Sequence, residues 1–191
     1  FYNQTSDDNI EIPVFPTPTI GMLGIVEDKT HITSLSFNSE KDLIFLIGTS
    51  KNNISCSEYL TSFHKIKESS TPEFCLDTEF KIQEAVKNLI RKNLIKSAHD
   101  VSDGGLFICL IESCIDKNFG FHINGEKSIR DDAFLFGESP SRIIVSVSKS
   151  KESNFVKHLE SEKVDFRLIG SVTSGEISYN DVSFGDIKDY K

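Results

Sequence analysis

A ten-residue apolar run directly after two glycines sets the strongest limit on the fold. Residues 106–115 are apolar except at Glu112 and Ser113, and they follow Gly104 and Gly105. A helix that is apolar on nearly every side is buried on most sides. The chain therefore needs enough other elements to enclose this helix, and its 191 residues suffice for one sizeable core.

The rest of the pattern predicts a mixed sheet with helices around it. Apolar residues recur at three- and four-residue steps over 77–92, which predicts an amphipathic helix that Asp77 or Thr78 would cap. Further helices are expected at 56–64, 131–136 and 152–161. Strands are expected at 20–27, around 32–37, 43–48, 119–123, 142–148 and 164–172, with a closing hairpin at 177–184 turned at Asn180 and Asp181 and an extended piece at 94–98. Strands and helices interleave without strict alternation, so the predicted fold class is α/β (α+β), a mixed β-sheet flanked by helices.

Residues 1–19 differ from the remainder. Pro13, Pro16 and Pro18 punctuate this polar stretch, and proline favours extended backbone. We expect an extended linker at 1–19, following something longer, and one domain at 20–191.

Charge and cysteine usage narrow the classes of partner. The net charge of −8 argues against a nucleic-acid surface, which needs a basic face. No apolar run approaches the roughly 20 residues that span a bilayer, so no membrane segment is expected. The four cysteines form no CxxC pair and have no zinc spacing, and we therefore expect a reduced, cytoplasmic chain.

The first polar constellation is SAHDVSDGGL, residues 97–106. A helix that starts at Gly104 and Gly105 presents unpaired backbone N–H groups and a partial positive charge. Asp100 and Asp103 would repel a bare phosphate, so either a divalent ion bridges them or Asp103 caps its own helix. Spacing alone favours the cap, and it favours a hydrogen-bonded structural role for His99.

The second constellation is LFGESPSRIIVSV, residues 135–147. It places Glu138 and Ser139 at the mouth of a buried strand, where polar groups can meet a ligand. Arg142 could pair with Glu138 or with a phosphate. Spacing alone favours a plain turn with a surface ion pair.

The third constellation is PTPTIGMLGIVED, residues 16–28. Gly21 and Gly24 within an apparent strand indicate a bulge or the close approach of another backbone. Neither GxGxxG nor GxxxxGK[ST] occurs, no serine sits in a nucleophile elbow, and the other histidines have no metal-ligand spacing.

Together the three segments, in this order, resemble the C-terminal portion of the phosphoribosylformylglycinamidine synthase (PurL) family, within the aminoimidazole-ribonucleotide synthetase (PurM-like) superfamily. The opening FYNQT and the late RLIGSVTSGEI are similar to the same family, so the resemblance spans nearly the whole chain. It implies a PurM-like C-terminal domain that follows a missing upstream ATP-binding-type domain.

The resemblance also implies an activity for the parent enzyme. The family is an ATP-dependent purine-biosynthesis ligase that converts formylglycinamide ribonucleotide, ATP and glutamine-derived ammonia to formylglycinamidine ribonucleotide. Mg²⁺ shields the phosphates, and the ammonia comes from a glutaminase that is a separate subunit in short forms. The implied partners are the upstream domains and that subunit.

The same resemblance implies an auxiliary role for this domain. The family's substrate-contacting Glu-Ser-Gln belongs to the first half of the enzyme, and here Pro140 replaces the glutamine. The catalytic histidine and main magnesium carboxylates also lie upstream, so we expect no catalytic residue here, an inactive isolated chain, and one wall of an auxiliary nucleotide site. The metal ligands stay open. The candidate nucleotide or phosphate residues are His99, Asp100, Ser102, Asp103, Gly104, Gly105, Glu138, Ser139 and Arg142.

Two alternatives stay open at this point. The chain could be the same domain of another superfamily member, such as aminoimidazole-ribonucleotide synthetase, selenophosphate synthetase, thiamine-phosphate kinase or a hydrogenase-maturation protein. It could also be a structural module that packs against the parent and binds nothing.

Overall fold

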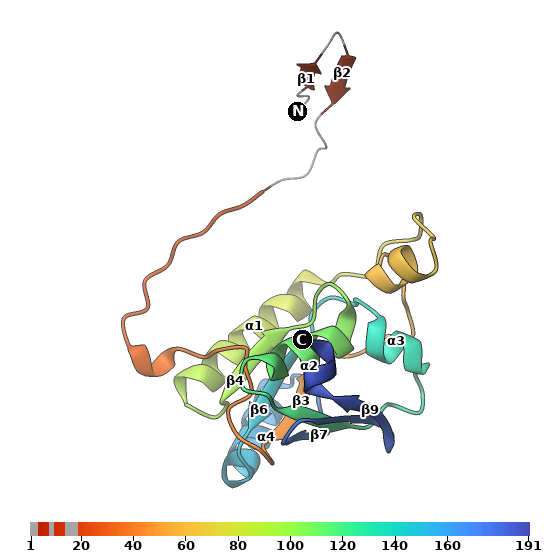
Figure 1. Cartoon of the computed structure of the whole chain (residues 1–191). Coiled ribbons are helices and arrows are strands. Elements are labelled where there is room, and N and C mark those ends of the chain that lie inside the picture. The colour runs from red at the N-terminus through yellow and green to blue at the C-terminus, as the bar shows by residue number, and fades with distance from the viewer. Residues whose placement is uncertain (1–3, 8–9, 14–18) are drawn as a thin grey trace.

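A computed structural model describes residues 4–7, 10–13 and 19–191 of the chain (Figure 1). Strands β1 (Gln4–Asp7) and β2 (Ile10–Pro13) pair as a two-stranded antiparallel sheet inside the region expected to be a linker. Residues 1–3, 8–9 and 14–18 of that expected linker lie outside the described part of the chain. In the part that is described, no helix has the length and apolar character needed to cross a membrane.

A seven-stranded sheet forms the centre of the fold, in the order β4-β6-β3-β7-β5-β8-β9. Neighbouring strands are antiparallel except β5 and β8, which run parallel, so the prediction of a mixed sheet is confirmed. The strands are β3 (Leu43–Ile47), β4 (Ser97–Asp100), β5 (Gly120–Ile123), β6 (Ile143–Val147), β7 (Phe166–Thr173), β8 (Glu176–Tyr179) and β9 (Val182–Asp186).

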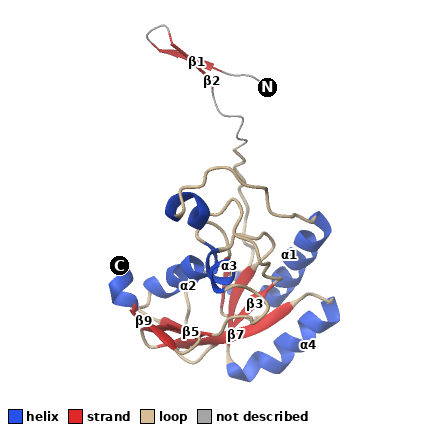
Figure 2. Ribbon diagram, turned by 90° about the vertical axis from the view of Figure 1, so that its right-hand side faces the viewer, coloured by secondary structure: helices blue, strands red, loops and turns tan. Residues whose placement is uncertain are grey.

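Helices cover both faces of the sheet (Figure 2). They are α1 (Leu76–Arg91), α2 (Gly105–Ile115), α3 (Asp131–Phe136) and α4 (Glu152–Glu162), with short turns η1 (Lys29–His31), η2 (Tyr59–Phe63), η3 (Lys149–Lys151) and η4 (Ile187–Tyr190). Alternation along β3 divides the core: Ile44 and Leu46 join the cluster under α2 and α3, whereas Phe45 and Ile47 join the cluster under α1 and α4. This two-sided burial explains why β3 is apolar at every position.

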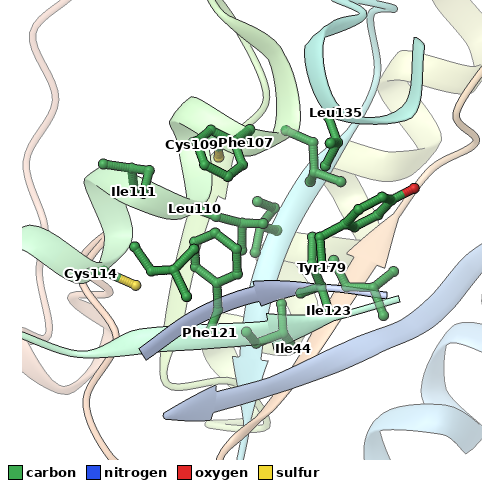
Figure 3. Close-up of a cluster of buried hydrophobic side chains, with 14 of the residues drawn as sticks. Ile44, Phe107, Cys109, Leu110, Ile111, Cys114, Phe121, Ile123, Leu135 and Tyr179 are labelled. Carbon is green, nitrogen blue, oxygen red and sulfur yellow. The ribbon is translucent and has the colours of Figure 1, made fainter. Parts of the chain in front are cut away.

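Helix α2 is the buried helix that its sequence predicts. Leu106, Leu110 and Cys114 are completely buried. Figure 3 shows Leu110 on the side of the helix that faces Phe121 and Ile44 of the sheet. Only Ile108 and Glu112 are exposed along the helix. The apolar run therefore decides which segment lies at the centre of the larger cluster.

Four local predictions need correction. The predicted strand at 20–27 is wrong, because these residues have no strand partner and are exposed throughout. The strand expected around 32–37 is reduced to one isolated bridge between Ser34 and Ser97. The helix expected at 56–64 is shorter, the single π-helical turn η2. The extended piece expected at 94–98 begins three residues further along the chain, where it forms strand β4.

The start of α1 is also not the one expected. Cys75 is the N-cap residue, rather than Asp77 or Thr78, and its thiol is exposed. The side-chain and backbone polar groups of Thr78 stabilise the thiolate and hold the pKa of Cys75 below its usual value. By contrast, burial raises the pKa of Cys114 to about 12 and raises that of Cys109 as well.

We therefore expect selective thiol labelling. At neutral pH, iodoacetamide should modify Cys75 readily and leave Cys109 and Cys114 unmodified in the native protein, since the thiolate is the nucleophile. The pH at which the labelling rate of Cys75 reaches half of its maximum should lie below that of an ordinary thiol. Thr78→Val should raise this midpoint pH. Peptide mass spectrometry across pH measures both effects. Equal labelling of Cys75 and Cys114 in the folded chain would contradict the prediction.

Candidate functional site

The candidate site lies at the turn between the end of β4 and the start of α2. Strand β4 pairs with β6, and the backbone then turns, with Val101 donating to the Arg142 carbonyl and Gly105 donating to the Ser102 carbonyl. Gly104 and Gly105 both have left-handed backbone, with φ of +82° and +71°. A Cβ at Gly105 would lie 2.8 Å from the Gly137 carbonyl oxygen, so the chain needs glycine here for conformation and for space.

Glu138 joins the two sequence constellations. One of its carboxylate oxygens accepts hydrogen bonds from the backbone N–H groups of Gly104 and Glu58, each at 2.8 Å. This places a negative charge at the positive end of the α2 dipole. The prediction that Asp103 caps its own helix is wrong, because the N-cap is Gly104, has no side-chain cap, and Asp103 is exposed.

Arg142 has a different role from the one expected. Its side chain is 2% exposed and donates to the carbonyls of Ser139 and Gly137 at 2.9 and 2.5 Å, and to the Ser50 hydroxyl at 3.3 Å. Burial lowers the pKa of the guanidinium to about 10. Among the described residues these contacts stand in place of the expected ion pair with Glu138, and the pairing with a phosphate stays a prediction. Arg142, together with the buried Ser139, holds the turn that carries Glu138.

His99 lies between two carboxylates. Its Nε2 is 2.8 Å from a Glu112 carboxylate oxygen and its Nδ1 is 3.5 Å from one of Asp100. The histidine is therefore hydrogen-bonded, the role that spacing favoured. Asp100, whose side chain is 77% exposed, and the exposed Ser102 and Asp103 remain open to solvent at the mouth of the turn.

The carboxylates near the turn can supply only part of a metal site. Within the described residues no group of three or more His, Cys, Asp or Glu side chains could hold a metal ion. Mg²⁺ in nucleotide sites is commonly held by one or two carboxylates together with phosphates and water. The exposed Asp100 fits such a role as a single ligand, with the other ligands coming from elsewhere.

Sequence reasoning missed the loop that borders the start of α2. Glu58, Tyr59, Ser62 and Phe63 of the η2 region line a shallow, open surface pocket of about 340 Å³ with Gly104, Ile108 and Phe136. The Tyr59 ring stacks on Phe63 at 5.4 Å and on Phe136 at 4.9 Å. No local signal in the sequence indicates this contact, because it joins segments far apart along the chain.

Comparison with known proteins shows which family this chain belongs to. The family described as AIR synthase related protein, C-terminal domain, matches residues 40–181. The phosphoribosylformylglycinamidine synthase subunit PurL of Thermoanaerobacter pseudethanolicus is 37% identical over 90% of this chain and 24% of its own length. PurL of Prochlorococcus marinus subsp. pastoris is 39% identical over 86% of this chain and 22% of its own length. The chain thus spans about a quarter of the length of these relatives.

Solved structures agree at the level of the fold. PurL of Thermotoga maritima, in the structure described as complexed with FGAR, aligns with a TM-score of 0.72 over 84% of this chain and 29% of its own, at 15% identity. The hydrogenase maturation protein HypE, in complex with ATP, aligns with a TM-score of 0.55 over 77% of this chain and 49% of its own. The relatives of much higher sequence identity favour PurL over the other superfamily members. The chain therefore belongs to the PurL family and carries its AIR synthase related C-terminal domain.

Proposed function

We propose that this chain is the C-terminal domain of an ATP-dependent phosphoribosylformylglycinamidine synthase acting in cytoplasmic purine biosynthesis. The complete enzyme would convert formylglycinamide ribonucleotide, ATP and glutamine-derived ammonia to formylglycinamidine ribonucleotide. The identity of 37% over 90% of this chain supports the assignment. Because the chain spans only 24% of that relative, the reaction is a property of a longer protein.

Within that enzyme, we propose that the β4–α2 turn forms one wall of an auxiliary nucleotide site. The observation that carries this role is that different residues support and line the turn. Buried Arg142 and half-buried Glu138 hold the backbone, and Asp100, Ser102 and Asp103 stay exposed. Asp100 would contribute to Mg²⁺ and Ser102 would donate to a phosphate oxygen. Magnesium, when bound, would shield the phosphate charge that the aspartates repel.

The remaining ligands and the catalytic groups would come from partners. The upstream domains would complete the pocket, and a glutaminase subunit would supply ammonia if the enzyme is of the short form. A structure described as PurLQS from Thermotoga maritima shows that one PurL assembles with further subunits. We accordingly expect the isolated chain to release no phosphate from ATP with substrate and ammonia.

Nucleotide content of the longer enzyme tests the auxiliary role. We expect the wild-type longer enzyme to copurify with a nucleotide and Asp100→Asn and Ser102→Ala to lose it. Asp116→Asn, an exposed control beyond the other end of α2, should retain it. Chromatography of the acid-released nucleotide gives the stoichiometry. Retention of nucleotide in all three variants would contradict the proposal that the β4–α2 turn lines a nucleotide site.

A structural module without a ligand is the second candidate, and one observation favours it. The Glu138 carboxylate already accepts from the Gly104 N–H, so no bound anion is required there. Unchanged nucleotide content in Asp100→Asn and Ser102→Ala would support this candidate.

A further inference from the structure

Residues 20–26 form the most exposed apolar segment in the described chain. Ile20, Met22, Leu23 and Ile25 are 82–105% exposed, and Val26 is 60% exposed. The segment is extended but pairs with no strand. Contiguous apolar surface of this kind marks an interaction site in soluble proteins.

The alternation of the segment indicates what would cover it. In extended backbone, Ile20, Met22 and Val26 point to one side, and Leu23 and Ile25 point to the other. Neither side carries a charge between residues 20 and 26. A strand that is apolar on both faces is typical of the interior of a covered sheet, as β3 shows in this same protein.

The two glycines of the segment have no explanation within the described residues. A Cβ at Gly21 or Gly24 would meet nothing within 4 Å, and neither has left-handed backbone. Gly170 in β7 differs, because a Cβ there would lie 1.9 Å from the His122 carbonyl oxygen. Glycines in a strand mark the close approach of another backbone. For Gly21 and Gly24 that backbone is not among the described residues.

The segment is anchored at its C-terminal end. Asp28 caps η1, accepting from the Thr30 backbone N–H at 2.8 Å, and Ser34 then bridges to Ser97 at the edge of β4. Next to η1 the segment borders α1, where Ile25 and Val26 line a surface pocket with Val86 and Ile90. Towards Ile20 it runs away from the helices and the sheet (Figure 1). The fold therefore holds the base of the segment and presents its apolar residues outward.

We propose that residues 20–26 are a docking strand that inserts into a covered β-sheet in the part of the longer enzyme outside this chain. The proposal rests on the proposed function, because it takes its occupant from the length of the relatives, of which this chain spans 24%. The partner is defined by its chemistry: a sheet with a free strand position, apolar cover on both faces, and backbone close enough to require Gly21 and Gly24. Backbone pairing would supply the hydrogen bonds, and the alternating side chains would pack against the elements that cover the two faces of that sheet.

Hydrogen exchange measured on this chain and on the longer enzyme tests the docking strand. We expect the amides of residues 20–26 to exchange without protection in this chain and to be slowed by about 100-fold or more in the longer enzyme. Gly24→Val should leave the unfolding midpoint of this chain unchanged and abolish the protection in the longer enzyme. Leu76→Asp alters an equally apolar residue that is 70% exposed on α1, and it should leave that protection intact.

Three outcomes would overturn the proposal. They are unprotected amides at 20–26 in the longer enzyme, protection that survives Gly24→Val, and protection in this chain that grows with its concentration, which would assign the strand to a second copy. Nucleotide content separates this proposal from the auxiliary site. Loss of nucleotide in Asp100→Asn with the strand still protected supports both proposals, and an unprotected strand with nucleotide retained in the wild type overturns the docking strand alone.

Discussion

Replacement of Arg142 by methionine is expected to lower the free energy of unfolding by about 3–5 kcal/mol. The guanidinium is buried and donates to two backbone carbonyls, of Gly137 and Ser139, and methionine would leave both without a donor. The same turn carries Glu138, so the support of the Gly104 N–H would loosen as well. Methionine keeps much of the arginine volume, and the loss therefore measures the hydrogen bonds rather than a cavity.

Arg130→Met is the matched control. Arg130 pairs with Asp132 at 2.7 Å with its side chain 56% exposed, so its loss should change stability by about 1 kcal/mol or less. Urea unfolding followed by circular dichroism gives both values. The Arg142→Met effect should not vary between pH 6 and 8, because Arg142, with its pKa lowered to about 10, stays protonated there in both the folded and the unfolded state. Equal effects of the two substitutions would refute the structural role of Arg142.

Gly105→Ala is expected to lower the free energy of unfolding by about 3 kcal/mol or more. Left-handed backbone costs a non-glycine residue about 1–2 kcal/mol, and forcing atoms into a packed region adds about 1–3 kcal/mol. The new Cβ would lie 2.8 Å from the Gly137 carbonyl oxygen and from two backbone atoms of Phe136. Backbone atoms cannot rotate away, so α2 would have to move from α3.

Gly24→Ala provides the comparison for this substitution. A Cβ there meets nothing within 4 Å, and the unfolding temperature of this chain should stay the same. Differential scanning calorimetry of the two variants distinguishes a positional effect from a general cost of replacing glycine. A Gly105→Ala protein as stable as the wild type would show that the α2 start tolerates a side chain.

The sequence predicted the elements whose pattern is set by burial within this chain. Helix α1 follows the three- and four-residue spacing, α2 follows the largely apolar run, and β3 is apolar at every position because both of its faces are covered. The segment at 20–27 is similarly apolar, yet it is not a strand in this chain. An apolar pattern indicates that a segment is suited to burial, but it does not say which other segment covers it. The wrong prediction at 20–27 is the observation from which the docking strand is proposed.

For the candidate site, the sequence indicated which turns to consider but not how they contact each other. Sequence reasoning selected the β4–α2 turn and the turn before β6, and the structure brings Gly104 and Glu138 within 2.8 Å. It assigned Asp103 to the helix start and missed Glu138, because that contact joins residues far apart in the sequence. The burial of Arg142 also depends on tertiary contact, because its guanidinium donates both to the turn at Gly137 and Ser139 and to the distant Ser50.

The position of β3 at the middle of the sheet has a consequence for biosynthesis. Leu43 pairs with Val147 on one side and Ser171 on the other, both separated from it by more than half the length of the chain. The first fully apolar strand to leave the ribosome thus waits, unpaired, until nearly all of the domain has been translated. Pairing between residues so far apart in the sequence is slow, and the apolar surface of β3 stays exposed until it is complete. We therefore expect nascent chains of this domain to depend on chaperones.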